Sequence, residues 1–168
     1  MNQLKYINAY PEHLKNQIQT LIDQNKLSNY LLSRFPTPHD INNDRALREY
    51  VGDIKNQYMK KSGSLSKIQY DNKIHLVNNA LGMHSYVSRV QGNKLKSKNE
   101  LRISTVFKKA PFELLNMICV HELAHLKEKE HNKAFYKLCQ YMLSDYHQLE
   151  FDARVYLTQL EFFGEIYE

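Results

Sequence analysis

A pentapeptide of the form HExxH places two histidines four residues apart in an apolar stretch of the chain. Residues four apart advance about 400° around an α-helix, so His121 and His125 share one face, one turn apart. Two imidazoles so placed can bind one tetrahedral zinc ion. Glu122 then lies beside the metal, where it can accept a proton from a water instead of acting as a ligand. The pattern predicts a metal site with Glu122 as its general base.

His131 is the expected third ligand, and it requires the chain to turn after His125. On an unbroken helix His131 would lie about 600° beyond His125, roughly 120° away from the ligand face. The intervening residues 126–130 are mostly charged and can end the helix. Glu128 stands where the metzincin motif HExxHxxGxxH has glycine, so this turn must be of another kind or cost more backbone energy. We expect one Zn²⁺ per chain, held by His121, His125 and His131, although such sites also accept other divalent ions.

Length and composition indicate one globular domain over residues 1–168. The chain is 42% hydrophobic and 24% charged, which allows a sizeable core. The first thirty residues contain charged and amide side chains throughout, and no run of eighteen apolar residues occurs. We therefore expect a cytoplasmic protein with no membrane partner. Cys119 and Cys139 lie in apolar stretches without CxxC spacing, so we expect free buried thiols.

Apolar periodicity predicts an N-terminal helical layer at 1–62, a small mostly antiparallel sheet at 65–107 and metal-binding helices at 111–168. The helices are expected near residues 11–26, 43–62, 111–125, 132–143 and 149–162. Two hairpins are expected, one joining 68–70 to 74–77 through an Asp-Asn turn and one joining 86–91 to 100–105.

This order of elements predicts an α+β, zincin-like fold. The strand Leu101–Thr105, just before the motif helix, is expected to form a sheet edge above the metal. An edge strand offers unpaired N–H and C=O groups to an extended peptide, which would place a scissile bond over the zinc.

The run VHELAHLKEKEHNKAFYKLC at residues 120–139 resembles the YgjP-like metallopeptidase family, whose signature is a HELxH helix, a third histidine and a phenylalanine–aromatic pair. Phe135 and Tyr136 supply that pair. The runs SRVQGNKLKSKNELRIS at 88–104 and SDYHQLEFDARVYL at 144–157 also resemble this family, which is similar to the SprT and WLM zincin-like groups.

The resemblance implies the same site as the spacing does. It assigns His121, His125 and His131 as metal ligands and Glu122 as the catalytic acid and base. It implies a zinc-dependent peptidase or related amide hydrolase acting on a peptide or protein substrate.

Several other residues are candidates for supporting roles. Tyr146 or His147 could donate a hydrogen bond to the oxyanion formed on a hydrolysed carbonyl, although a structural role is the alternative. Glu150 lies 25 residues after His125, a separation at which gluzincins place a carboxylate ligand. Asp145 or Asp152 could orient a ligand imidazole. The remaining histidines have no ligand spacing.

Two rival functions stay open. The net charge of +5 and three alternating lysines, Lys94, Lys96 and Lys98, are compatible with a SprT-like protease associated with nucleic acid, or with a DNA-binding factor. Alternatively, the zinc could be a structural ion closed by a fourth protein ligand, without turnover. Oligomeric state and cleavage specificity do not follow from the sequence.

Overall fold

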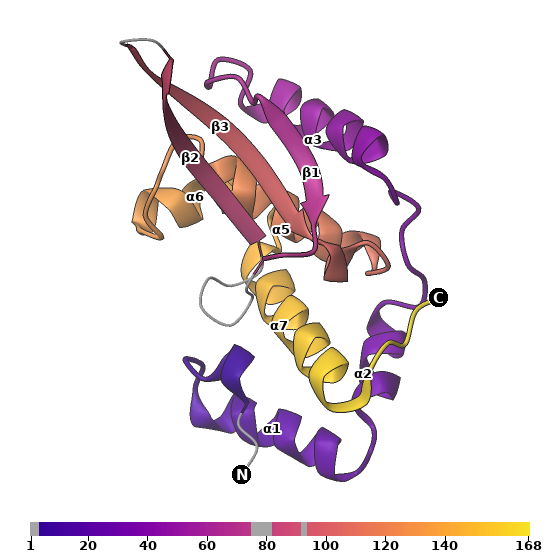
Figure 1. Ribbon diagram of the computed structural model, residues 1–168. Helices are drawn as coiled ribbons and strands as arrows, with labels where there is room; N and C mark the ends of the chain where they lie inside the picture. The colour runs from indigo at the N-terminus through magenta and orange to yellow at the C-terminus, as the bar shows by residue number, and fades with distance from the viewer. Residues whose placement is uncertain (1–3, 75–81, 92–93) are drawn as a thin grey trace.

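The computed structural model describes residues 4–74, 82–91 and 94–168, with side chains for residues 4–74 and 99–168. The fold is α+β: a three-stranded sheet is packed against helices from both ends of the chain (Figure 1). In chain order the elements are η1 (Lys5–Ile7), α1 (Glu12–Asp23), α2 (Leu27–Arg34), α3 (Asp44–Tyr58), β1 (Lys67–Asp71), β2 (Gly82–Gln91), β3 (Lys94–Ser104), η2 (Thr105–Phe107), α5 (Phe112–Ala124), α6 (Lys133–Met142) and α7 (Tyr146–Phe163).

The sheet has the order β1-β3-β2. β2 and β3 pair in antiparallel register from Gly82↔Ile103 to Gln91↔Lys94, which confirms the second expected hairpin with longer strands. β1 instead pairs with β3 in parallel, so the sheet is mixed, although its longer strand pairing, between β2 and β3, is antiparallel as expected. Asp71 does form a turn, accepting the Lys73 N–H at 2.8 Å, and β1 pairs with β3. Residues 75–77 of the first expected hairpin lie outside the described part of the chain.

The expectation of an edge strand before the motif helix is wrong. Residues 101–104 belong to β3, the central strand, and Thr105 begins η2. Leu101 and Ile103 are fully buried, as a strand hydrogen-bonded on both sides and covered by helices should be. The edges of the described sheet are β1 and β2, and β2 lies on the side of α6 in Figure 1.

The motif helix α5 occupies the centre of the molecule. It packs against β2, β3, α3, α6 and α7, and a helix surrounded in this way must be apolar on nearly every side. Pro111 fits its N-terminal boundary because proline has no N–H to leave unsatisfied. Of the eleven residues from Leu114 to Ala124, all but the partly exposed Asn116 are buried: Leu114, Leu115, Met117, Ile118, Cys119, Val120, His121, Glu122, Leu123 and Ala124. Packing on all sides therefore fixes the position of the motif.

The N-terminal helices occupy two places instead of one layer. α2 and η1 pack against α7, whereas α3 packs against β1 and α5 (Figure 1). In the described part of the chain no helix has the length and apolar character needed to cross a membrane. Cys119 and Cys139 are both free and buried, as expected from their spacing.

Candidate metal centre

The chain turns immediately after the HExxH motif. α5 ends at Ala124, and His125 is its C-cap, with φ −67° and ψ −13°. The turn is closed by N–H groups of residues 126–128 that donate to the carbonyls of Leu123 and Ala124 at 3.0–3.1 Å. Glu128 is not among the non-glycine residues with positive φ, so the turn does not use the glycine conformation of the metzincin motif. The predicted turn after His125 is confirmed. Of the two kinds expected, it is the one in which Glu128 does not adopt a strained backbone conformation.

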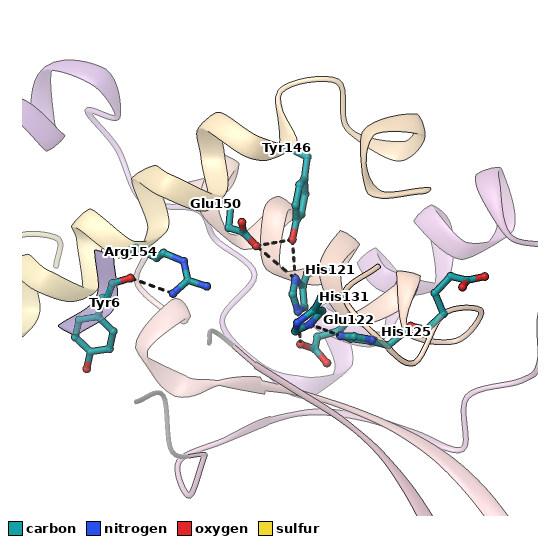
Figure 2. Close-up of polar contacts among 9 residues, drawn as sticks. Tyr6, His121, Glu122, His125, His131, Tyr146, Glu150 and Arg154 are labelled. Carbon is teal, nitrogen blue, oxygen red and sulfur yellow. Dashed lines mark hydrogen bonds and ion pairs between the residues drawn. The ribbon is translucent and has the colours of Figure 1, made fainter. Parts of the chain in front are cut away.

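This turn brings the three predicted ligands together. One nitrogen from each of His121, His125 and His131 lies within 4.8 Å of the other two, and the Nε2 atoms of His125 and His131 are 3.1 Å apart. Their rings come from the buried end of α5 and from the exposed segment before α6. Figure 2 shows the three imidazoles converging beside Glu122. Among the three ligands, the cluster is most open to solvent at His131, because His121 is buried, His125 is half-buried and His131 is exposed.

The partner of His125 determines which of its ring nitrogens can bind a metal. Its Nδ1 lies 2.9 Å from the backbone oxygen of Glu128. A carbonyl oxygen only accepts hydrogen bonds, so Nδ1 must donate its proton and Nε2 keeps its lone pair. That lone pair points toward Nε2 of His131. The turn after α5 thus sets the tautomer of His125 as well as the position of His131.

His121 is held by two residues of α7. Its Nδ1 lies 2.6 Å from the hydroxyl of Tyr146, and that hydroxyl donates to Oε2 of Glu150 at 2.9 Å (Figure 2). Burial lowers the pKa of the His121 imidazole well below its ordinary value, and the neighbouring His125 and His131 lower it further. The ring is therefore neutral near pH 7, as a metal ligand must be.

Glu122 is a buried carboxylate with one unpaired oxygen. Its Oε2 is 3.9 Å from Nε2 of His121, and its Oε1 has no hydrogen-bond partner among the described residues. Burial raises the pKa of this carboxyl well above its ordinary value. A raised pKa increases the proton affinity of the carboxylate, which suits a group that must accept a proton during a reaction.

Aromatic rings fill the space around the imidazoles. Phe135 is fully buried, and its ring centroid lies 5.0, 4.5 and 4.9 Å from those of His121, His125 and His131. Tyr136, the other member of the expected aromatic pair, lies next to Phe135 at 5.1 Å. Asn132 caps α6 by accepting the Phe135 N–H at 2.8 Å, which fixes the start of the helix that supplies both rings.

The other candidates have different neighbours from those expected. The carboxylate of Asp152 binds Arg34, and Asp145 is exposed, so the contacts of these two residues do not support the expectation that either orients an imidazole. Glu150 lies on the Nδ1 side of the His121 ring. Its carboxylate is not part of the cluster formed by His121, His125 and His131. The oxyanion role of Tyr146 or His147 stays a prediction, since the Tyr146 hydroxyl contacts a ligand and His147 is exposed.

Sequence reasoning missed the link between Tyr146 and Glu150. The signal was present, because residues four apart on a helix share a face and both face α5. Periodicity alone could not show that α7 would place this face against His121. His39, one of the histidines without ligand spacing, has a structural role: its Nε2 lies 2.7 Å from the Phe107 carbonyl and its Nδ1 accepts the Ile41 N–H.

The residues present fit a divalent metal ion. Nitrogens bound to one tetrahedral zinc at about 2.0–2.1 Å lie a little over 3 Å apart, close to the 3.1 Å between His125 and His131. Two of the three rings have Nδ1 paired elsewhere and Nε2 turned into the cluster. The unpaired oxygen of Glu122 lies beside them. This donor set is that of a metal-binding site with an adjacent base.

Comparisons with known proteins agree with this chemistry. The family described as YgjP-like, metallopeptidase domain, matches residues 44–152. A protein of Escherichia coli (strain K12) named UTP pyrophosphatase is 56% identical over 160 residues, covering 95% of this chain and 96% of that protein. No solved structure is similar enough to count as a match. A hydrolase is supported by both similarities, and the chain belongs to the YgjP-like metallopeptidase domain family.

Proposed function

We propose that this protein is a zinc-dependent hydrolase that cleaves a phosphoanhydride bond of UTP and releases pyrophosphate. The observation that supports this substrate most strongly is 56% identity, over nearly the whole of both chains, to a protein named UTP pyrophosphatase. The three imidazoles would hold the ion. A bound zinc ion supplies an acidic water and an electrophile that withdraws charge from the reacting oxygen.

Glu122 acts as the general base in this proposal. It accepts a proton from the attacking water, whose oxygen forms a new bond to phosphorus while the bridging P–O bond breaks. The leaving group departs as pyrophosphate, and Glu122 returns its proton to solvent or product. The raised pKa of the carboxyl and its unpaired oxygen support this role.

Charge near the metal site also favours an anionic substrate. Lys127, Lys129 and Lys133 are exposed and lie within four residues of His131 in the sequence, where they outnumber the two glutamates of the same segment. Lysine side chains bind phosphate as compact point charges. The net charge of +5 acts in the same direction over longer distances.

The second candidate is the peptidase expected from the motif. It is favoured by the family description and by β2, which forms an edge of the described sheet and packs against α5. An extended peptide could pair with such an edge. In that reaction Glu122 would pass the proton of the water to the leaving amine.

One experiment separates the two candidates. The protein is stripped with a chelator, reloaded with zinc, and incubated in parallel with UTP and with a library of unstructured peptides. UMP and pyrophosphate formed only by the reloaded protein, with the peptides intact, is the expected result. Cleaved peptides with intact UTP would favour the peptidase. The Glu122→Gln variant, carried through the same steps, reports any contaminating hydrolase.

A further inference from the structure

The hydroxyl of Tyr146 lies between a metal ligand and a buried carboxylate. It is 2.6 Å from Nδ1 of His121 and 2.9 Å from Oε2 of Glu150, whereas that carboxylate oxygen is 3.9 Å from Nδ1. The last distance is too long for a hydrogen bond. Figure 2 shows the tyrosine side chain pointing into this gap. Glu150 therefore contacts His121 through the tyrosine hydroxyl.

The direction of these hydrogen bonds follows from the chemistry of the groups. As a carboxylate, Glu150 can only accept, so the Tyr146 hydroxyl donates to it. A hydroxyl has one proton, so toward His121 its oxygen must accept, and Nδ1 must be the protonated ring nitrogen. This leaves the lone pair of His121 on Nε2, the nitrogen nearer to Glu122. The chain of bonds thus selects the tautomer that can bind a metal.

The fold holds this arrangement rigidly. Tyr146 and Glu150 are one turn apart on α7, which packs against α5. Tyr146 is fully buried, and its ring is nearly parallel to that of His121, at 17° with centroids 6.3 Å apart. Because the side chains of Tyr146 and His121 are both buried, water has little access to the hydrogen bond between them, which favours one orientation of the His121 ring.

We propose that Tyr146 and Glu150 form a hydrogen-bond relay that fixes the tautomer and orientation of His121 and so strengthens metal binding. They are positioning residues, because they act on the ion only through His121. A carboxylate in direct contact with a ligand histidine commonly has this task, and here a tyrosine is inserted between them. The inference rests on the metal site of the proposed function but not on the choice of substrate.

The test measures metal affinity, not turnover. Chelator-stripped protein is titrated with zinc in competition with a chromophoric chelator. Tyr146→Phe removes only the hydroxyl and should weaken zinc binding by roughly 10- to 100-fold. Glu150→Gln keeps an oxygen that can accept from the tyrosine and should lose less than Glu150→Leu, which keeps none.

A matched control removes a hydroxyl of the same kind elsewhere on α7. Tyr156 is also buried, and its hydroxyl donates to the Val106 carbonyl at 2.8 Å without touching a ligand. Tyr156→Phe should lower thermal stability about as much as Tyr146→Phe does, yet leave zinc affinity unchanged. Circular dichroism confirms that each variant is folded.

Each outcome decides the proposal. Equal zinc affinity of Tyr146→Phe and wild type would overturn the relay, even if UTP hydrolysis were established. Equal weakening by Tyr146→Phe and Tyr156→Phe would overturn it too, because the loss would then follow from general destabilisation. A wild-type protein that binds no zinc would overturn the relay together with the metal site. Zinc bound as expected, without UTP hydrolysis, would leave the relay standing and remove the proposed substrate.

Discussion

Two buried carboxylates in this molecule have opposite surroundings. Asp152 on α7 accepts hydrogen bonds from Arg34 at 2.5 Å, Gln148 at 3.3 Å and Tyr30 at 3.5 Å. Glu122 on α5 is almost completely buried, but its Oε1 has no hydrogen-bond partner among the described residues. The same chemical group is therefore satisfied at the contact between α2 and α7 and left unsatisfied at the metal centre.

Under the proposed function, this difference separates a structural carboxylate, Asp152, from a reactive one, Glu122. Burial raises the pKa of both carboxyls, but at Asp152 the hydrogen bond and charge of Arg34 act against the increase. At Glu122, among the described residues, no charge or hydrogen bond acts against the increase in pKa. A folded protein tolerates such an unpaired group at a functional site because the cost of burial is offset by the rest of the core.

The largest effect is expected from Glu122→Gln. Turnover of the substrate should fall by about 10²–10⁴-fold, because the amide cannot accept the proton of the attacking water. In the metal-free protein the free energy of unfolding should stay the same or rise, since a buried ionisable group is replaced by a neutral one. Steady-state kinetics and urea denaturation measure the two quantities. If the variant kept full activity, Glu122 would not be the reactive carboxylate. If it unfolded far more easily, Glu122 would stabilise the fold as Asp152 does.

Arg34→Met tests the other carboxylate. It leaves Asp152 buried and without its cation, and breaking such a pair typically costs about 3–5 kcal/mol. Because the Arg34 side chain is 37% exposed, water screens the pair and we expect about 2–4 kcal/mol less unfolding free energy. Arg45→Met is the matched control, since its pair with Glu49 is fully on the surface and should contribute less than about 1 kcal/mol. Equal losses in the two variants would show that Asp152 does not need its partner.

The pH dependence of Arg34→Met gives a smaller but sharper effect. A carboxyl whose pKa is raised in the folded state binds more protons when folded, so stability falls as pH rises through that pKa. Without Arg34 the pKa of Asp152 should rise further above its ordinary value. The stability deficit of the variant should thus be fully present near pH 7 and shrink as the pH is lowered. Urea denaturation at several pH values measures it, and a constant deficit would contradict the assignment.

The smallest effect compares two helix caps. The side chain of Asn132 accepts the Phe135 N–H at 2.8 Å, and that of Asn43 accepts the Ala46 N–H at 2.9 Å. Replacing either asparagine by alanine should cost about 1 kcal/mol of stability. Only Asn132→Ala should also weaken zinc binding, because residue 132 adjoins His131 and begins the helix that positions it. Similar zinc affinities in both variants would mean that His131 is placed by other contacts.

Much of the site was predictable because its signal is local. The spacing within HExxH fixes one helix face, and the charged residues after it indicated the turn that returns His131 to the cluster. The five expected helices were also placed correctly to within a few residues, since periodicity and proline positions are properties of short segments. The short helix α2 was not expected.

The errors concern contacts between distant segments. The alternation of apolar residues identified β3 as a strand but could not show that β1 would pair with it in parallel and make it central. Asp152 was a reasonable candidate for orienting a ligand, yet its partner is Arg34, 118 residues earlier in the chain. The relay through Tyr146 escaped prediction for the same reason, because it depends on how α7 packs on α5.

The measurement that tests the central claim most directly is the metal content of the purified protein after dialysis, by mass spectrometry. The account predicts about one divalent ion per chain in wild type and in Glu122→Gln, and a large loss of metal in His131→Ala. Metal retained in full by His131→Ala, or absent from wild type after reloading, would contradict it.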